Sequence, residues 1–212
     1  RDLVRSRGLG DVYKRQSLQG PWPQKIAIIG GGPAGLSCAY FLALQGYRPT
    51  VFEKNEHPGG MLRYGIPSFK LEKDVIDAEI DILRELGVTI RCGVEVGKDV
   101  TLANLRAQGY KAFYLAIGCQ GGRTAGVPGE DAAGIQTAVA LLRTVGGDES
   151  HKMTGKTVVI GGGNVAIDAA RVALRCGSSD VTMVCLEPRE KMPASAEEIA
   201  EAEEEGLSLI HI

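Results

Sequence analysis

A glycine pattern that occurs twice constrains the fold of this chain more than any other feature. Residues 30–35 (GGGPAG) follow residues 25–29 (KIAII), and residues 161–166 (GGGNVA) follow residues 156–160 (KTVVI), two runs that end in apolar residues. Each run has the length of a short buried strand, and apolar residues at helical spacing follow each glycine pattern. Strand, glycine-rich turn and helix in this order are the fingerprint of a dinucleotide-binding βαβ unit. We therefore predict an α/β fold that contains two such units.

In the first copy each glycine has its own structural reason. Gly30 allows a tight turn, Gly32 lets the backbone approach a pyrophosphate, and Gly35 lets helix and strand pack closely. The start of the helix directs free N–H groups and a partial positive charge at the phosphates. Glu53 ends the next predicted strand, 23 residues after Gly30. Its carboxylate can accept hydrogen bonds from a ribose hydroxyl there.

The second copy differs at its last position, where Ala166 replaces glycine. Alanine still permits close contact between helix and strand, so this variant is accepted. The next predicted strand, residues 181–185, leads to Glu187, which lies 26 residues after Gly161. One such motif is weak evidence, but two in the required context indicate that the chain binds two dinucleotides. The economical chemistry is hydride transfer from a nicotinamide to a flavin. For this the protein supplies orientation, so we assign no catalytic side chain.

The composition argues against several other classes of protein. The 212 residues carry a net charge of −2 and have a pI of about 6.0, so we expect no nucleic-acid partner. No apolar run is long enough to cross a membrane and no signal-peptide pattern occurs, so we expect a cytoplasmic protein without membrane insertion. The five cysteines include no C-x-x-C pair, which argues against a disulfide framework, a zinc site and a redox-active cysteine pair. We expect reduced thiols and no metal site.

Two further stretches are candidates for ligand contact. Residues 56–67 (EHPGGMLRYGIP) are too apolar for an ordinary solvated loop, so they either line a ligand or form a turn-rich connection. The predicted strand 110–117 ends at Gly118, which opens a Gly- and Pro-rich loop. Such a loop is expected where a chain crosses between two nucleotide domains. Residues 197–205 are strongly acidic and are expected to form the solvated face of a helix.

The two ends of the chain are related in an unusual way. Residues 11–16 (DVYKRQ) and 207–212 (LSLIHI) can be encoded by DNA sequences that are reverse complements of each other. That DNA resembles a transposase end sequence used to build sequencing libraries. We therefore expect residues 1–16 and 207–212 to be translated adapter, which leaves residues 17–206 as a fragment cut at both sides.

Several stretches together resemble the glutamate synthase small-subunit family of flavoproteins. They are residues 28–67, LAIG at 115–118, VPGED at 127–131, residues 158–177 and MPAS at 192–195. The resemblance covers nearly all of residues 24–206. It implies two Rossmann-like dinucleotide-binding domains, both truncated here. An FAD-binding domain (residues 24–146) would be interrupted by an inserted NAD(P)-binding domain (residues 147–206).

The resemblance also implies which residues contact each cofactor. Those implied for FAD are Gly30, Gly32, Pro33, Ala34, Gly35, Glu53, Lys54, Gly59, Gly60, Leu62 and Gly118. Those implied for NAD(H) or NADP(H) are Gly161, Gly163, Asn164, Val165, Ala166, Glu187 and Arg189. In this family electrons usually pass on to iron–sulfur clusters, which we expect outside this chain. They would be held by a cysteine-rich segment ahead of the FAD domain or by a partner, such as a large catalytic subunit.

One departure from the family bears on the choice of nicotinamide cofactor. NADPH-using relatives have Tyr-Arg-Arg at the end of the second strand of the nicotinamide domain. The matching residues here are Cys185, Leu186 and Glu187. Arginines suit a 2′-phosphate, whereas a carboxylate repels it and favours a free 2′-hydroxyl. We therefore predict a preference for NADH, with Arg189 as the residue that could restore phosphate binding.

The resulting hypothesis is an FAD-dependent NAD(P)H oxidoreductase that feeds iron–sulfur centres. One alternative is a subunit of another NAD(P)H-dependent electron-transfer or bifurcating complex. Another is a pyridine-nucleotide disulfide reductase, which the absence of C-x-x-C argues against. A chain with two incomplete domains is expected to be inactive by itself even when its parent is an enzyme.

Overall fold

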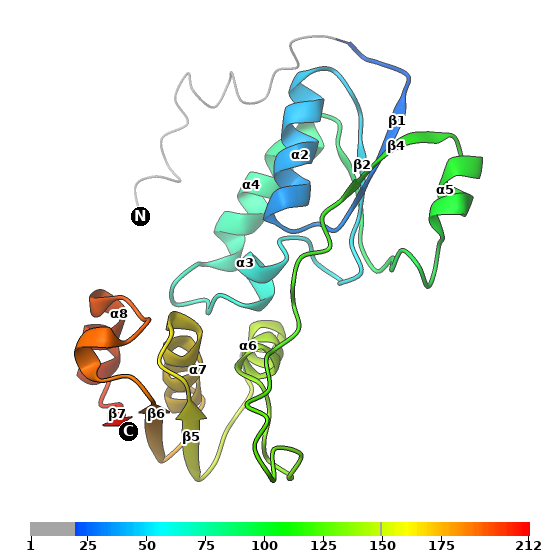
Figure 1. The fold of residues 1–212 in the computed structure, drawn as a ribbon. Coiled ribbons are helices and arrows are strands. Elements are labelled where there is room, and N and C mark those ends of the chain that lie inside the picture. The colour runs from blue at the N-terminus through cyan, green and yellow to red at the C-terminus, as the bar shows by residue number, and fades with distance from the viewer. Residues whose placement is uncertain (1–19, 149) are drawn as a thin grey trace, which may run out of the picture. The chain divides into compact units, whose positions relative to one another are not determined.

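The computed structural model describes residues 20–148 and 150–212, which form two compact units (Figure 1). The first unit comprises the described residues up to Arg63 together with Ser68–Cys119, and the second comprises Tyr64–Pro67 together with Gln120–Ile212. Each unit contains one of the two glycine turns, so each can be described by itself.

The first unit is built on a parallel four-stranded sheet. In spatial order its strands are β3 (Thr89–Arg91), β2 (Thr50–Phe52), β1 (Lys25–Ile29) and β4 (Tyr110–Leu115). Its helices are α2 (Pro33–Leu44), α4 (Lys73–Glu85), α5 (Leu102–Ala107) and α3 (Met61–Tyr64), of which the last residue, Tyr64, is counted with the second unit. The chain runs from β1 outward to β2 and β3, then returns to place β4 on the other side of β1. In open sheets of this kind ligands bind beyond the carboxyl ends of the strands, where the strand order reverses.

Different helices cover the two faces of this sheet. Gly35, Ala39 and Ala43 are the buried residues of α2, and their small size lets this helix lie close to the sheet. The same cluster includes Ile28, Val51, Ile82 and Leu83, from β1, β2 and α4. On the other face Leu105 of α5 belongs to a second cluster with Ala27, Ile29, Phe52 and Tyr110. The central strands β1 and β2 are therefore buried on both sides, as expected for parallel strands.

The second unit has a parallel three-stranded sheet. Its strands, in spatial order, are β5 (Lys156–Ile160), β6 (Asp180–Cys185) and β7 (Ser208–His211). Its helices are α6 (Ala138–Gly147), α7 (Asn164–Arg175) and α8 (Ala196–Glu204), and a 3₁₀ turn covers Arg189–Lys191. One side of α7 packs against α6, where Leu141 is buried with Ala169 and Val172.

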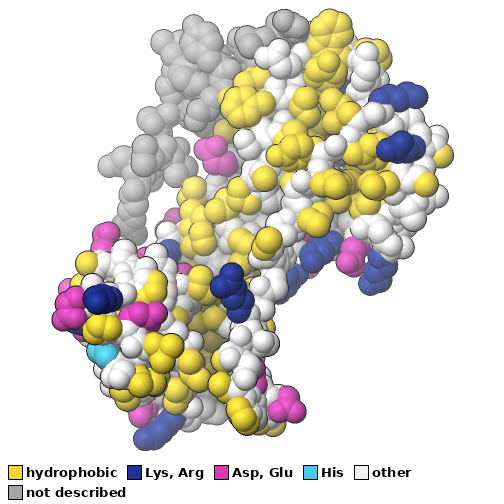
Figure 2. All heavy atoms as spheres, in the orientation of Figure 1, with side chains coloured by type: hydrophobic (Ala, Val, Ile, Leu, Met, Phe, Trp, Pro, Cys, Tyr) yellow, Lys and Arg dark blue, Asp and Glu magenta, His cyan; other side chains and the backbone are white. Residues whose placement is uncertain are grey.

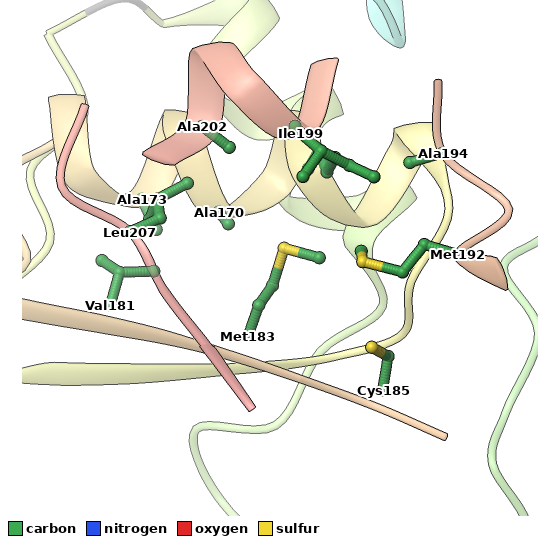
Figure 3. Close-up of a cluster of buried hydrophobic side chains, with 11 residues drawn as sticks. Ala170, Ala173, Val181, Met183, Cys185, Met192, Ala194, Ile199, Ala202 and Leu207 are labelled. Carbon is green, nitrogen blue, oxygen red and sulfur yellow. The ribbon is translucent and has the colours of Figure 1, made fainter. Parts of the chain in front are cut away.

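The other side of α7 faces a core shared with β6 and α8, which Figure 3 shows. Ala170 of α7, Met183 of β6 and Ile199 of α8 are buried in this cluster. Met192 and Ala194 also belong to it, although they lie in the irregular segment that precedes α8. Their burial holds that segment in place against the helix and the strand.

The acidic helix α8 is bound to α7 by ion pairs. The guanidinium of Arg171, whose side chain is only 7% exposed, lies 2.5 Å from Glu201 and 2.6 Å from Glu205. Arg175 contacts Glu205 as well, at 2.7 Å. Burial by itself would raise the pKa of Glu205, but hydrogen bonds from Arg175 and Arg171 outweigh it and lower that pKa. The expectation of a merely solvated face was therefore wrong for this side of α8.

The boundary between the two units differs from the predicted domain boundary after residue 146. Residues from Gln120 onward belong to the second unit, so α6 lies in this unit and not in the first. The reason is that α6 buries its apolar side against α7. An amphipathic pattern in a sequence shows that a helix has a buried face but not which neighbour covers it.

The C-terminal strand β7 lies within the segment that we expect to be translated adapter. It pairs in parallel with β6, and Cys185 pairs with His211 in register. Leu207, just before it, is buried in the core. This pairing shows that the segment fits a strand, and its origin stays a prediction. The N-terminal counterpart, residues 1–16, lies outside the described residues.

Hydrophobic atoms reach the surface on both units (Figure 2). Leu115 and Ile117, at the end of β4 and just beyond it, are among the exposed apolar side chains. Val158 and Ile160 of β5 are exposed as well. Within the described residues, β4 and β5 each have a sheet edge without a neighbouring strand. None of the helices in residues 20–148 and 150–212 has the length and apolar character needed to span a membrane.

Candidate functional site

The first glycine turn lies where the carboxyl ends of β1, β2 and β4 meet. Gly30 has a φ of +107°, a backbone conformation that residues other than glycine rarely adopt. Its N–H donates to the carbonyl oxygen of Phe52 at 2.8 Å. A Cβ built on Gly30 would lie only 2.2 Å from the carbonyl oxygen of Ala116. This residue must therefore be glycine for the three strand ends to meet.

The same turn brings α2 close to β1. A Cβ on Gly35 would lie 1.9 Å from the carbonyl oxygen of Gly30, so only glycine fits there. Gly32 is the N-cap of α2, Pro33 and Ala34 begin its first turn, and no side chain caps the helix. The uncapped N–H groups of a first helical turn are suited to bind a phosphate. The predicted roles of this turn in the fold are thus met, and pyrophosphate contact stays a prediction.

The acid at the end of β2 is held against the turn. Oε2 of Glu53 accepts the N–H of Gly31 at 2.6 Å. Its Oε1 accepts the backbone N–H and the side-chain Nδ2–H of Asn55, at 2.9 and 2.7 Å. Glu53 is only 4% exposed. Two carboxylate oxygens offer about four acceptor positions, so the three contacts described leave capacity for a ribose hydroxyl.

The loop of residues 56–67 returns to the turn. Gly59 donates its N–H to the carbonyl oxygen of Gly31 at 2.7 Å. A Cβ on Gly60 would lie 2.7 Å from Cα of Gly32, so the two backbones touch. These contacts place the loop beside the glycine turn, and its role in lining a ligand stays a prediction.

Buried charge holds this loop in place. Arg63 donates through Nε to the carbonyl oxygen of Pro58 at 3.0 Å and forms an ion pair with Asp77 of α4. Lys73 donates to the carbonyl oxygen of Leu62 at 3.4 Å. The last two candidates, Lys54 and Gly118, are both exposed. Gly118 has a φ of +66°, with open space where a Cβ would point.

The second turn repeats the geometry of the first. Gly161 has a φ of +138°, and its N–H donates to the carbonyl oxygen of Val184 at 2.9 Å. Gly163 is the N-cap of α7, again without a side-chain cap. A Cβ on Gly161 would lie 3.4 Å from the Cβ of Ala166, an ordinary contact. Alanine is therefore accommodated where the first turn requires Gly35.

The acid after β6 lies beside the second turn. A Cβ on Gly162 would lie 3.0 Å from the Cβ of Cys185 and 3.4 Å from Oε2 of Glu187. The guanidinium of Arg189 forms a two-pronged ion pair with Glu203 of α8, in which Nη2 and Oε2 are 2.7 Å apart. Glu187 is therefore the charge that lies next to the turn, while Arg189 is held by a carboxylate of its own.

Asn164 is used in a way that the sequence did not suggest. Its Oδ1 accepts the N–H of Ser195 at 3.0 Å, and the neighbouring Ala194 donates its N–H to Gly162 at 3.0 Å. Val165 is exposed. The role of Asn164 and Val165 toward a nicotinamide stays a prediction.

Sequence reasoning missed the middle glycine of each turn. It named the outer glycines of the fingerprint, but Gly31 and Gly162 are the ones that lie against the strand-end acids. It also missed Asn55, which holds the Glu53 carboxylate. The triplet GGG, present in both copies, was the signal that could have found the two glycines.

The cysteines show no sign of redox pairing. All five are free. Burial raises the pKa of the Cys38, Cys92 and Cys176 thiols, and the charge of Glu53 raises that of Cys92 further. A raised pKa keeps a thiol protonated and weakly nucleophilic. Within the described residues, no group of three or more potential ligands is placed to hold a metal ion.

Several known proteins are similar in sequence to this chain. The profile of the pyridine nucleotide-disulphide oxidoreductase family matches residues 24–209. The chain is 46% identical over 187 residues to NADP(+)-dependent formate dehydrogenase subunit beta of Moorella thermoacetica, covering 87% of this chain and 26% of that protein. It is 42% identical over 189 residues to NAD-dependent dihydropyrimidine dehydrogenase subunit PreT of Escherichia coli K12, covering 88% and 45%.

The predicted resemblance to glutamate synthase is confirmed. The glutamate synthase [NADPH] small chain of Halomonas elongata is 38% identical over 197 residues, covering 88% of this chain and 42% of that protein. The chain thus spans less than half the length of these curated relatives. FprA of Mycobacterium tuberculosis in complex with NADPH is 25% identical with a TM-score of 0.72, covering 87% of this chain and 48% of that one. The predicted α/β fold with two Rossmann-like units is confirmed.

Proposed function

This chain belongs to the pyridine nucleotide-disulphide oxidoreductase family, and from that premise we propose which dinucleotide each unit holds. The family comprises FAD- and NAD(P)-dependent oxidoreductases. The first unit binds FAD and the second binds a nicotinamide dinucleotide. In the full-length protein, hydride passes from the nicotinamide to the flavin.

The observation that carries this proposal is the repeated turn at the carboxyl ends of the strands. A Cβ would lie 2.2 Å from a backbone oxygen at Gly30 and 1.9 Å from one at Gly35. Both positions therefore require glycine, which leaves the backbone of the turn without side chains there. Gly161, the first glycine of the second turn, has a positive φ like Gly30. A side-chain-free turn that leads into an uncapped helix suits a diphosphate, because backbone N–H groups can reach its oxygens directly.

The residues of the chain would bind and orient the two cofactors, and the cofactors would supply the redox chemistry. When bound, the nicotinamide supplies a hydride and the flavin accepts it. The turn amides would hold the diphosphates, and Glu53 would accept a hydrogen bond from a ribose hydroxyl, while Asn55 and Gly31 fix its carboxylate. The loop at Gly59 and Gly60 narrows the site beside the turn. Orientation of two bound reactants is a large part of catalysis in such enzymes.

We further propose that the nicotinamide site prefers NADH. The relatives include both NAD-dependent and NADP(+)-dependent proteins by name, so we use the local charge to assign the preference. Oε2 of Glu187 lies close to Gly162, and its charge would repel a 2′-phosphate. Arg189, which could offset this repulsion, is paired with Glu203.

Onward electron transfer to iron–sulfur centres is the third part of the proposal. The relatives are named subunit beta, subunit PreT and small chain, so those proteins are parts of larger assemblies. We propose the same for the protein that contains this chain, with the clusters held outside these 212 residues. Disulfide reduction is the weaker candidate, because the chain has no C-x-x-C and burial raises three of its thiol pKa values.

Anaerobic reduction of the full-length protein tests the proposal. The purified protein should carry a flavin, and NADH should bleach the flavin absorbance at lower concentration than NADPH. A protein that purifies without flavin and does not bind added FAD would refute the assignment of the first unit. A clear preference for NADPH would refute only the cofactor choice.

A further inference from the structure

In the first unit a short loop returns to the glycine turn after the strand-end acid. Gly59, six residues after Glu53, donates its N–H to the carbonyl oxygen of the middle glycine, Gly31, at 2.7 Å. The next residue, Gly60, touches the backbone of Gly32. Helix α3 then begins at once, at Met61. The loop therefore lies along two successive residues of the turn.

The second unit contains the same relationship, formed by a different sequence. Ala194, seven residues after Glu187, donates its N–H to the carbonyl oxygen of the middle glycine, Gly162, at 3.0 Å. The next residue, Ser195, donates its N–H to Oδ1 of Asn164 at 3.0 Å. Helix α8 then begins at once, at Ala196. No glycine pair marks this loop, which is why the sequence did not reveal the equivalence.

The second loop is held rigidly and exposes alternate residues. Met192 and Ala194 are buried in the core that Figure 3 shows, so the backbone cannot easily move away from the turn. Pro193 and Ser195 are exposed. Cδ of Pro193 lies 3.4 Å from the position of a Cβ on Gly162, which places the exposed residues at the turn itself.

We propose that Pro193 and Ser195 form a wall of the nicotinamide-dinucleotide site, as Gly59 and Gly60 do for the first site. This inference rests on the proposed function of the second turn. Ser195 lies within one hydrogen bond of Asn164, the first residue of α7, and is therefore next to the backbone that would hold the diphosphate. The ligand chemistry is the diphosphate of a dinucleotide and its adjoining ribose.

A negative charge at Ser195 tests the proposal without removing a structural contact. Oγ of Ser195 caps α8 by accepting the N–H of Glu198 at 3.3 Å, and both Asp and Asn can replace that cap. Ser195→Asp adds a charge that repels the diphosphate, and Ser195→Asn adds the same bulk without charge. Ala200→Asp, at an exposed position of α8 five residues after Ser195, adds the same charge on the same helix.

Binding of NADH and of ADP-ribose to the full-length protein is measured by calorimetry, and folding is checked by thermal denaturation. Ser195→Asp should weaken binding about ten-fold or more, because two charges a few ångströms apart repel strongly near a protein surface. Ser195→Asn should weaken binding far less, and Ala200→Asp should leave it unchanged.

Three outcomes would contradict either the wall proposal or the proposed function. Equal affinities of Ser195→Asp and the unaltered chain, with both folded, would overturn the wall proposal and leave the proposed function intact. An equal loss in Ala200→Asp would also overturn it, because the effect would then be one of general charge. Failure of the unaltered full-length protein to bind either nucleotide would instead overturn the proposed role of the second unit.

Discussion

Oε2 of Glu53 accepts the backbone N–H of Gly31 at 2.6 Å, so the acid at the end of β2 is joined directly to the turn after β1. A Cβ on Gly31 would lie 3.0 Å from the same oxygen, which is tighter than ordinary contact. In the second unit Oε2 of Glu187 is 3.4 Å from the corresponding point on Gly162. In both units the middle glycine leaves room for a carboxylate beside the glycine turn.

Replacing the first of these acids should weaken flavin binding. Glu53→Gln keeps the size of the side chain but removes its charge, and hydrogen bonds to charged groups contribute about 1.5–3 kcal/mol. We expect the FAD dissociation constant of the full-length protein to rise about ten-fold or more, measured by flavin fluorescence. Glu79→Gln, at an exposed position of α4, is the matched control and should bind FAD normally. Unaltered affinity in Glu53→Gln would show that this carboxylate does not contact the ribose.

Adding one methyl group at the first turn should destabilise the fold. A Cβ on Gly35 would lie 1.9 Å from the carbonyl oxygen of Gly30, so α2 or β1 must move to accept Gly35→Ala. Overpacking of this kind costs about 3 kcal/mol of unfolding free energy. Urea denaturation measures the loss. Ser37→Ala, at an exposed position of the same helix, should change stability by less than about 0.5 kcal/mol, and a similar cost at both positions would contradict the geometry.

The ion pairs between α7 and α8 should make stability depend on pH in the acid range. The pKa of Glu205 is lowered in the folded chain, with hydrogen bonds from Arg175 and Arg171 outweighing burial. The unfolded chain therefore binds the proton more readily. Glu205 contributes its stabilisation fully above its ordinary pKa of 4.5 and loses it as pH falls through the lower folded value.

A comparison of Glu205→Gln with the unaltered chain isolates this effect. The variant should be less stable near pH 7, and the difference in unfolding free energy should shrink as the pH falls below about 4.5. Urea denaturation at several pH values provides the measurement. A difference that stays constant from pH 7 to pH 3 would mean that the charge of Glu205 is not involved.

Two substitutions in the second unit should shift cofactor choice toward NADPH. Glu187→Ser removes the carboxylate beside Gly162, and Glu203→Gln releases Arg189 from its charged partner. We expect each to raise the ratio of kcat/KM for NADPH to that for NADH by about three- to ten-fold, since single charged contacts are worth about 1 kcal/mol. Glu190→Gln is the control, because Glu190 lies in the same 3₁₀ turn as Arg189. No change in the ratio for Glu187→Ser would remove this acid from the account of specificity.

Local sequence was sufficient where a short pattern specifies both structure and position. The limits of β1 and β5 match the strands predicted at residues 25–29 and 156–160. Helices α2 and α7 begin inside the glycine fingerprints, as expected. It failed at α5, a helix of six residues with too few apolar positions to show a period. The signal there was the capping box of Thr101 and Asn104, which marks a helix start.

The sequence by itself determined the two dinucleotide fingerprints, the strands and helices around them, and the family. These depend on neighbouring residues, because glycine conformation and apolar spacing are local properties. The tertiary structure decided which groups meet at each turn. Glu53 is 22 residues from Gly31, and Ser195 is 31 residues from Asn164. Only the alignment of parallel strands, with their carboxyl ends at one edge of a sheet, brings such distant residues within hydrogen-bonding distance.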